Sequence, residues 1–561
     1  MAAFDETFDW VVVGNGAGSM SSALVMRQAG KSVLILEKSP FAGGTTAKSG
    51  GVMWIPNNRF MRDAGEKDSA EAAIAYLDAC AATDSGDAPG TSHERRLAYV
   101  QRSPRMIDFL VGQGVKLERA TDFWPDYYDQ LPGGCKTTRC VVAQLFDTNA
   151  LGEWQNKLRP GFLPVPAKLD EAMKLPYYRK SWLGRWMFLK VAARTVWTRL
   201  TGKKVVSAGA ALQGRMLHAA LKAGADIRLE SPVSELVVEE GRVTGVVTVK
   251  DGKPWRVGAR LGVLVNAGGF ARNQAMRDKY MPGTRADWSQ TSEGDMGEMH
   301  VEMERIGGVL AQMDQMVGYQ CTLVPGWEKM FPVPPAQSLT GKPHAILVDQ
   351  SGVRYMSEGG SYELFCETML RRNRTVPAIP SWAIFDSDYI EQYMLAGTMP
   401  GGSKPKPWTE QDYLKQADSI EELAKRIRVD PAALKASVDR WNGFVEKGVD
   451  EDFHRGERAY DDWLGDPYHG PNKALGKIAR APFYAVNVVP GDVSTYGGAV
   501  IDVEGRVVKA DGSPIEGLYA AGVSTASVMG NVYPGAGASI GPSLTFGYIA
   551  AKHAAGLDNQ L

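Results

Sequence analysis

The sequence predicts an α/β protein built on a parallel β-sheet. Three short apolar segments run directly into glycine, at 10–14, 263–269 and 517–522. A β-branched or aliphatic run that ends in glycine is typical of a buried parallel strand. The three segments lie far apart in the chain, so the sheet would be assembled from separated pieces.

The first sixty residues give the fullest version of this pattern. A strand over 10–13 is followed by a glycine turn, a helix over 21–29 and a second strand over 32–36. Strand, glycine turn, helix and strand in this order predict a Rossmann-like dinucleotide-binding unit. Ser19 stands where this motif prefers Gly or Ala, which predicts a slightly looser contact between helix and strand.

The residue types in this unit suit a bound dinucleotide. Gly14 makes the tight turn, Gly16 lets the backbone approach a pyrophosphate, and the N-terminus of the helix faces the anion. Glu37 ends the second strand, where a carboxylate accepts hydrogen bonds from an adenosine ribose.

The next segment, 38–51, distinguishes between dinucleotides. Its long run of glycines and hydroxyl residues suits a backbone that lies along an extended cofactor. It resembles the second flavin-contact loop of the fumarate reductase/succinate dehydrogenase flavoprotein superfamily. Members with covalent flavin carry a histidine near this loop, and this loop has none. The resemblance therefore implies noncovalent FAD.

The same resemblance implies how the chain is divided. Residues 1–319 and 483–561 would form one FAD-binding domain, and 320–482 an inserted α+β catalytic domain. The glycine-rich stretch 534–541 leads into an apolar helix over 544–554. Such a helix entrance offers free N–H groups and a positive dipole end to a flavin ring.

The predicted cofactor-binding residues lie at the glycine-rich ends of these pieces. They are Gly14, Gly16, Ala17, Gly18, Glu37, Lys38, Gly43, Gly44, Thr45, Thr46, Ser49, Gly50, Gly51, Ala267, Gly268, Gly522, Ser539 and Ile540.

Within the superfamily, the chain most resembles the bacterial 3-ketosteroid Δ1-dehydrogenases over nearly its whole length. The more specific matches are Asp126-Tyr127-Tyr128 and the Tyr-Pro-Gly-x-Gly run at 533–537. The resemblance implies a 3-ketosteroid substrate and an external electron acceptor. Desaturation beside a ketone needs a base, a donor that polarises the carbonyl oxygen, and FAD as hydride acceptor.

The resemblance also implies roles for four residues. Tyr362 matches the general base for the C2 proton, and Tyr127 the tyrosine that assists it. Tyr533 and the backbone N–H of Gly537 match the pair that holds the 3-keto oxygen. Tyr127 is chosen over Tyr128 only because it is the first of the pair. A tyrosine base should have a pKa depressed below its reference value of about 10.

Other readings remain open at this stage. A relative could desaturate the Δ4 position of the same ketone, since pocket geometry decides regiochemistry. A fumarate-reductase-like enzyme would need an arginine and histidine clamp for two carboxylates, whereas this chain offers tyrosines. The chain could also be a flavin-carrying electron-transfer or membrane-tethering subunit without its own catalysis.

Composition excludes several functions. The net charge of −1 gives no reason to expect nucleic acid. The five cysteines lack zinc-type spacing and indicate reduced thiols in a cytoplasmic protein, and the scattered histidines imply no metal site. We find no signal peptide and no run of about 18 apolar residues that could span a bilayer.

The segment 151–205 is an unusual basic insert. It holds twelve basic and three acidic residues, a local charge of +9, and four of the fourteen tryptophans. Residues 181–200 have helical spacing with one apolar stripe. The stripe comprises Trp182, Trp186, Leu189, Ala193, Val196, Trp197 and Leu200.

Tryptophan in a basic amphipathic helix suits a membrane interface rich in anionic lipid. We therefore predict a protein held peripherally at the inner face of the cell membrane, with a quinone as one candidate acceptor. Two alternatives remain: the stripe could pack on the protein's own core or form an oligomer contact.

Overall fold

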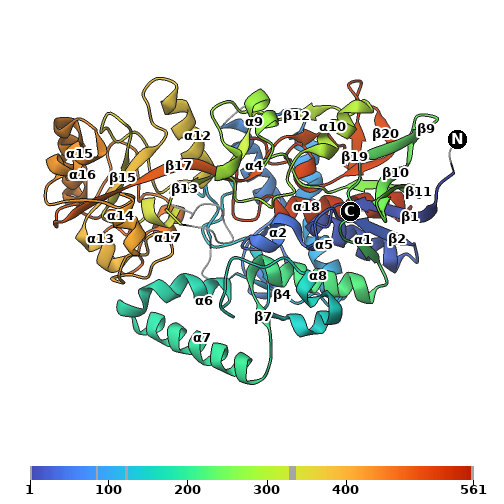
Figure 1. Cartoon of the computed structure of the whole chain (residues 1–561), viewed down its shortest axis with the longest axis horizontal. Coiled ribbons are helices and arrows are strands. Elements are labelled where there is room, and N and C mark those ends of the chain that lie inside the picture. Colours follow the sequence, from blue (N-terminus) through green and yellow to red (C-terminus); the bar gives the residue numbers. More distant parts are fainter. Residues whose placement is uncertain (1–2, 84–85, 121–123, 327–336, 558–561) are drawn as a thin grey trace.

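The computed structural model describes residues 3–83, 86–120, 124–326 and 337–557. The molecule is elongated, with a β-sheet in each half (Figure 1). The N-terminal strands occupy one half, and helices α15 (Ile420–Ile427) and α16 (Pro431–Lys447) lie at the far end of the other. Helix α7 (Trp182–Leu200) lies along one edge of the molecule.

The larger sheet has eight strands around a parallel core in the order β20-β11-β1-β2-β8. Its strands are β1 (Glu6–Val13), β2 (Val33–Leu36), β8 (Asp226–Arg228), β9 (Glu235–Glu239), β10 (Arg242–Lys250), β11 (Lys253–Val265), β19 (Arg506–Val508) and β20 (Pro514–Ala520). The three predicted strand-to-glycine segments lie side by side as β1, β11 and β20. The predicted α/β class and the split dinucleotide-binding sheet are therefore confirmed.

Two helices from opposite ends of the chain pack tightly beside this sheet. Helix α1 (Ala17–Gln28) contacts α18 (Ile540–Ala554). A Cβ added at Gly18 would lie 2.4 Å from the carbonyl oxygen of Ser543, and one at Gly547 would lie 2.3 Å from that of Gly18. Only glycine permits this close approach, which brings the C-terminal segment to the N-terminal glycine turn.

The second sheet is antiparallel and has five strands. They are β13 (Met316–Cys321), β14 (Ala345–Val348), β15 (Ser381–Phe385), β16 (Lys415–Ala417) and β17 (Phe483–Thr495). Residues of α15 and α16 share one apolar cluster with this sheet, and residues of α12 (Tyr362–Asn373) share another. This half is thus the predicted α+β unit.

The boundaries predicted at 320 and 483 stay a proposal. β13 spans residue 320, and β17 begins at Phe483 but pairs with β13, β15 and β16. The five-stranded sheet therefore extends beyond both predicted boundaries.

Outside the basic insert, the remaining elements of the described chain are α2 (Gly44–Lys48), β3 (Met53–Trp54), α3 (Arg59–Asp63), α4 (Ala70–Ala82), α5 (His93–Gly112), β4 (Leu117–Arg119), β5 (Cys140–Ala143), α8 (Ala208–Lys222), α9 (Gln274–Tyr280), α10 (Glu298–Arg305), β12 (Leu310–Ala311), α11 (Gln337–Thr340), α13 (Ser387–Gln392), α14 (Lys406–Glu410), α17 (Ala459–Leu464) and β18 (Gly498–Ala499), with 3₁₀ turns η3 (Ala286–Trp288) and η4 (Gly522–Ser524).

The basic insert begins and ends at one antiparallel strand pair, β6 (Phe146–Asp147) and β7 (Val205–Val206). Between them lie η1 (Thr148–Lys157), α6 (Leu169–Lys174), η2 (Leu175–Arg179) and α7. The predicted helix at 181–200 agrees with α7. Among the described residues, no helix is both long enough and apolar enough to cross a membrane.

Candidate active site

Asn266, at the end of β11, joins the three separated pieces of the large sheet. Its Oδ1 accepts hydrogen bonds from the backbone N–H and the hydroxyl of Ser19, at 3.1 and 3.0 Å. Its Nδ2 donates to the carbonyl oxygen of Ala521 at 2.8 Å and to the Ser543 hydroxyl at 3.2 Å. The sequence analysis missed this residue, although it directly precedes the Ala267-Gly268 pair.

The hydrogen bonds of Asn266 also explain why Ser19 and Gly16 occupy their positions in the glycine turn. Ser19 is fully buried and its hydroxyl bonds Asn266, so the serine adds a link to this contact. A Cβ at Gly16 would lie 2.7 Å from Asn266 Oδ1. Gly14 has φ of +92° and makes the predicted tight turn. Gly16 is therefore required by the protein's own packing, before any ligand is considered.

Glu37 is buried beside the glycine turn. Its carboxylate accepts hydrogen bonds from the N–H of Asn15 at 3.0 Å and of Ser39 at 2.8 Å, while burial raises the pKa of Glu37. Asn15 Oδ1 accepts from the N–H of Gly43 at 3.1 Å, but its Nδ2 is buried without a hydrogen-bond partner. An unused donor beside Glu37 and the N-terminus of α1 fits an anionic dinucleotide.

The predicted loop 43–51 forms α2 and the turn after it. Thr45 Oγ1 accepts from the N–H of Ser292 at 3.0 Å. Ser49 Oγ donates to the carbonyl of Thr46 at 2.7 Å and accepts from the N–H of Gly51 at 3.0 Å. The Ser49 hydroxyl is therefore used to shape the loop.

Three glycines of this loop have positive φ: Gly43, Gly44 and Gly51. A Cβ at Gly44 would meet open space. Gly50 packs near Leu169 of α6, and Lys38 forms an ion pair with Glu298. Gly44 thus leaves room beside the backbone, whereas Lys38 is engaged at the surface.

The later predicted cofactor residues lie beside these loops. The Ala267 N–H donates to the Ser524 hydroxyl, which in turn donates to the Gly268 carbonyl, both at 2.9 Å. Gly522 has φ of +64°, and an added Cβ would lie 2.6 Å from Asn266 Nδ2. Ser539 is the N-cap of α18, and Ile540 is its first residue. All three chain pieces thus meet in one place.

Three of the four predicted catalytic residues are tyrosines, and they meet between the two halves of the molecule. The ring centroids of Tyr127 and Tyr362 lie 5.4 Å apart, those of Tyr362 and Tyr533 5.4 Å, and those of Tyr127 and Tyr533 6.0 Å. All three side chains are at least nine-tenths buried. Residues more than 400 positions apart in sequence therefore form one aromatic cluster.

Tyr127 and its neighbour Tyr128 point to different partners. Tyr127 faces Tyr362 and Tyr533, whereas the Tyr128 hydroxyl donates to Glu363 at 3.3 Å. The backbone N–H of Tyr127 donates to the carbonyl of Pro534 at 2.9 Å. Tyr127 is thus attached directly to the loop that carries Tyr533.

A buried ionic network supports this loop. Asp126 accepts from Arg139 at 2.7 Å and from the Trp54 indole N–H at 2.8 Å, and Arg139 also pairs with Asp68 at 2.7 Å. Asp126 and Arg139 are both 1% exposed. Such a fully paired group fixes the backbone next to Tyr127, and breaking it would be costly.

Gly537 lies next to the Tyr533 hydroxyl. Its φ is +89°, and an added Cβ would lie 2.4 Å from the carbonyl oxygen of Val52. The Tyr533 hydroxyl lies 3.2 Å from Ser539 Oγ, and hydrogen bonds from Ser539 and from the Gly537 N–H oppose the rise that burial causes in the pKa of Tyr533. The predicted pair thus converges on one point.

The expected depression of the base's pKa is not found. Burial raises the pKa of Tyr362 well above its usual value, and a hydrogen bond from Tyr127 only partly opposes that rise. Burial also raises the pKa of Tyr127. The main reason is desolvation in the buried cluster, and the neighbouring phenols of Tyr533, Tyr460 and Tyr319 raise the pKa of Tyr362 further.

Two further tyrosines belong to the cluster and were missed. Tyr319 on β13 packs edge-on against Tyr362 with ring centroids 4.9 Å apart, and Tyr460 on α17 lies 4.3 Å from Tyr127. No local motif marks either residue. Only the three-dimensional arrangement brings them to the site.

One group of possible metal ligands exists among the described residues, away from the tyrosines. His344, Asp386 and Asp388 each place a ligand atom within 4.8 Å of the others. Asp386 already accepts three backbone N–H groups, and Asp388 pairs with Arg480 at 2.8 Å. These carboxylates are satisfied by the protein itself.

Comparison with known proteins identifies the family. A model described as an FAD binding domain matches residues 9–540. This chain belongs to that flavoprotein family. The cofactor is therefore FAD, and the buried Asn15 donor and the open space at Gly44 fit it.

Two similar proteins carry names of dehydrogenases. A 3-oxosteroid 1-dehydrogenase of Mycobacterium tuberculosis is 37% identical, with 98% of both chains covered. A 4-oxocyclohexanecarboxylate 2-dehydrogenase of Sinomonas cyclohexanicum is 32% identical, covering 98% of this chain and 93% of the relative.

Among solved structures, the 3-ketosteroid Δ1-dehydrogenase of Sterolibacterium denitrificans, in complex with 1,4-androstadiene-3,17-dione, has a TM-score of 0.91 and 34% identity. The match covers 98% of this chain and 100% of that one. A 3-ketosteroid Δ4-(5α)-dehydrogenase of Rhodococcus jostii has a TM-score of 0.68 at 21% identity, which shows the shared fold alone.

Proposed function

We propose that this flavoprotein is a 3-ketosteroid Δ1-dehydrogenase, which removes one hydrogen each from C1 and C2 of its substrate. The observation that carries the proposal is the buried contact of Tyr127, Tyr362 and Tyr533 beside Gly537. Its support is the family, in which relatives at 37% identity have this activity.

Activation of the substrate starts at its carbonyl. The Tyr533 hydroxyl and the Gly537 N–H would both donate to the 3-keto oxygen, because the two groups already lie together. Two donors at this oxygen stabilise the enolate charge that develops when C2 loses its proton. The buried, aromatic surroundings exclude water and strengthen both hydrogen bonds.

Proton removal would then fall to Tyr362. In its deprotonated form, the phenolate oxygen takes the C2 proton, while Tyr127 donates a hydrogen bond to that same oxygen and lowers its pKa. FAD, when bound, would supply the oxidant needed for removal of the C1 hydrogen as hydride. Tyr319 and Tyr460 pack against the base and its partner and hold both rings in place.

The residues predicted to hold noncovalent FAD keep that role in the proposal. The glycine turn at 14–18 and the N-terminus of α1 would face the pyrophosphate, with Glu37 at the ribose. The loop at 43–51, the Ala267-Gly268 pair and the entrance to α18 would lie along the remainder of the cofactor.

An activity assay tests this function. Purified protein is incubated with androst-4-ene-3,17-dione and an artificial electron acceptor, and the product is identified. A 1,4-diene is expected. In a parallel incubation with 5α-androstane-3,17-dione, desaturation at C4–C5 alone would instead favour a Δ4 enzyme. Turnover of 4-oxocyclohexanecarboxylate alone would restrict the substrate to small ketones.

We further propose that α7 attaches the enzyme to an anionic membrane surface. The whole predicted apolar stripe faces solvent: Trp182 and Leu200 are both 81% exposed, and Trp186 and Leu189 are 61% and 62% exposed. The opposite face of the helix is the buried one, through Gly184, Val191 and Thr198.

The membrane proposal is supported by the orientation of α7, whose apolar stripe faces solvent instead of the protein. Arg194 and Lys190 pair with buried Glu171 of α6, so charged side chains hold α7 to the protein while the apolar ones point outward. A contiguous exposed apolar face rimmed by cations is typical of an interfacial helix. Packing on the protein's own core does not account for it.

A vesicle assay tests this attachment. Trp182→Ser combined with Trp186→Ser should lower partitioning onto phosphatidylcholine–phosphatidylglycerol vesicles by about tenfold or more. Steroid oxidation with a soluble acceptor should not change. If partitioning is unchanged and the double variant dissociates a dimer, the stripe is an oligomer contact.

Attachment of α7 to a membrane would favour a membrane quinone as the electron acceptor.

A further inference from the structure

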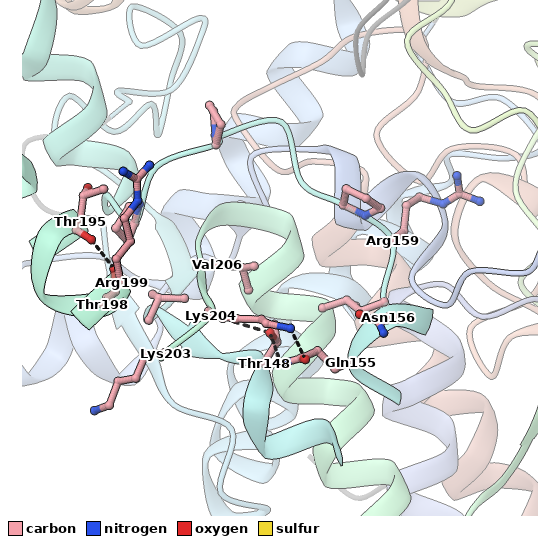
Figure 2. Close-up of a pocket in the computed structure, with 15 residues that line it drawn as sticks. Thr148, Gln155, Asn156, Arg159, Thr195, Thr198, Arg199, Lys203, Lys204 and Val206 are labelled. Carbon is pink, nitrogen blue, oxygen red and sulfur yellow. Dashed lines mark hydrogen bonds between the residues drawn. The ribbon is translucent and has the colours of Figure 1, made fainter. Parts of the chain in front are cut away.

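A cavity of about 370 Å³ lies at the C-terminal end of α7, between η1 and the segment 158–166 (Figure 2). Fifteen residues line it, among them Arg159, Arg199, Lys203 and Lys204. Four of them are basic and none is acidic. The size lies in the range of small-molecule sites, about 300–1,000 Å³.

The cations of this cavity differ from most in the protein. Arg199, Lys203 and Lys204 form no ion pair with an acidic residue in the described parts of the chain. Lys204 Nζ donates to the amide oxygen of Gln155 at 2.8 Å, and Lys203 Nζ lies 4.4 Å from the ring centre of Trp197. Three basic residues without an ion-pair partner in the described parts of the chain therefore line this cavity, although their side chains point in different directions (Figure 2).

The fourth cation, Arg159, belongs to the wall. It is 8% exposed, and its guanidinium bonds Glu293 at 3.1 Å and Ser39 at 2.8 Å. Figure 2 shows Arg159 and Arg199 on opposite sides of the cavity, with Lys204 between them. An anion in the cavity would therefore meet Lys204 between the two arginines, whereas the Lys203 amine points away from them and adds only to the positive charge nearby (Figure 2).

The C-terminal end of a helix normally repels anions, because its last carbonyls carry partial negative charge. In α7 these carbonyls are already bonded. The N–H groups of Thr201, Gly202 and Lys203 donate to the carbonyls of Trp197, Arg199 and Thr198, at 3.0, 3.3 and 2.9 Å. The unfavourable dipole is thus reduced at this end of α7.

The cavity adjoins the apolar stripe of α7. Trp197 is 51% exposed and lies beneath Lys203, and Leu200 follows Arg199 directly. We propose that this cavity, which we call the headgroup cavity, binds the phosphate group of one anionic phospholipid, with the acyl chains beside Trp197 and Leu200. This inference rests on the proposed attachment of α7 to a membrane.

Vesicle binding with a matched control tests the headgroup cavity. The triple variant Arg199→Gln, Lys203→Gln, Lys204→Gln is compared with Lys174→Gln, Arg179→Gln, Arg185→Gln. The control removes equal charge from the other half of the insert and keeps the pairs of Lys190 and Arg194 with Glu171. On phosphatidylcholine–phosphatidylglycerol vesicles, the first should lose about 100-fold in affinity and the second about tenfold. Equal losses would mean diffuse charge attraction and would overturn the proposal.

A soluble probe identifies the source of the phosphate. Glycerol phosphate should displace the native protein from these vesicles at an ionic strength matched with sodium chloride, and it should not do so for the headgroup-cavity variant. If inorganic phosphate binds the cavity but the variant keeps full vesicle affinity, the ligand is a soluble phosphate and the lipid proposal is wrong.

The two membrane proposals fail in different ways. If α7 does not attach the protein to membranes, the Trp182→Ser, Trp186→Ser variant keeps its affinity for vesicles of every composition. If α7 attaches but the headgroup cavity is inactive, that variant loses affinity while the cavity variant still prefers phosphatidylglycerol over phosphatidylcholine alone.

Discussion

The tyrosine cluster and helix α7 use aromatic side chains in opposite ways. Tyr127, Tyr362 and Tyr533 are buried and surrounded by other phenols, whereas Trp182 and Trp186 extend into solvent. The cluster unites three distant segments, while α7 is one continuous element held by salt bridges. Burial gives the tyrosines fixed geometry, and exposure leaves the tryptophans available to an external partner.

The largest effect should come from the base. Tyr362→Phe keeps the ring packing but removes the atom that takes the proton, so kcat should fall about 10²–10⁴-fold. FAD content should stay at the native level, because the predicted FAD residues lie elsewhere. Turnover is measured with an artificial acceptor, and a near-native rate would remove Tyr362 from its proposed role.

Tyr533→Phe should give the next largest effect. It removes one of two donors to the 3-keto oxygen, a change that costs about 10²–10³-fold in kcat for comparable sites. The Gly537 N–H remains and preserves part of the activation. A variant that changes KM alone would show that Tyr533 binds substrate and transition state equally.

The pair Tyr127 and Tyr128 provides an internal control. Tyr127→Phe removes the hydrogen bond to Tyr362, which should slow turnover about tenfold to 100-fold. Tyr128→Phe removes a contact to Glu363 that lies outside the cluster, and turnover should change by less than about threefold. The reverse order would mean that the first-of-pair choice was wrong.

The pH dependence follows from the raised pKa of Tyr362. The rate depends on the deprotonated phenol, and the pKa in the free enzyme governs kcat/KM. The logarithm of kcat/KM should therefore rise with pH and continue rising up to about pH 10. If log kcat/KM instead reached a plateau near neutral pH, the burial of Tyr362 in the free enzyme would not be what sets the pKa of the base.

The smallest effect concerns stability. Trp182→Ser should change the free energy of unfolding by no more than about 0.5 kcal/mol, because the side chain is 81% exposed. Trp54→Ala, which removes a fully buried ring and its bond to Asp126, should cost about 3–5 kcal/mol. Denaturant titration of both variants distinguishes the two environments, and comparable losses would contradict the exposed position of α7.

Sequence patterns predicted the fold well where they were local. The strand and glycine turn at 10–18 and the helix at 181–200 depend on neighbouring residues, and β1, α1 and α7 agree with them. Asn266 could not be predicted, since its partners lie 247 to 277 positions away. Tyr319 and Tyr460 were missed for the same reason.

Two physical properties could not be predicted from the sequence: the direction in which the apolar stripe of α7 faces and the pKa of Tyr362. The periodicity of 181–200 predicts an apolar stripe but not which way it faces, and the salt bridges to Glu171 turn it outward. The pKa of Tyr362 depends on burial among phenols from other segments, so its direction was predicted wrongly.

The most direct test of the central claim follows the flavin itself. The purified yellow protein is mixed anaerobically with androst-4-ene-3,17-dione, while the absorbance band of oxidised flavin is monitored and the product is identified. We expect bleaching in the native protein with formation of the 1,4-diene, and no rapid bleaching in Tyr362→Phe. Unbleached flavin in the native protein, or equal bleaching in the variant, would contradict this expectation.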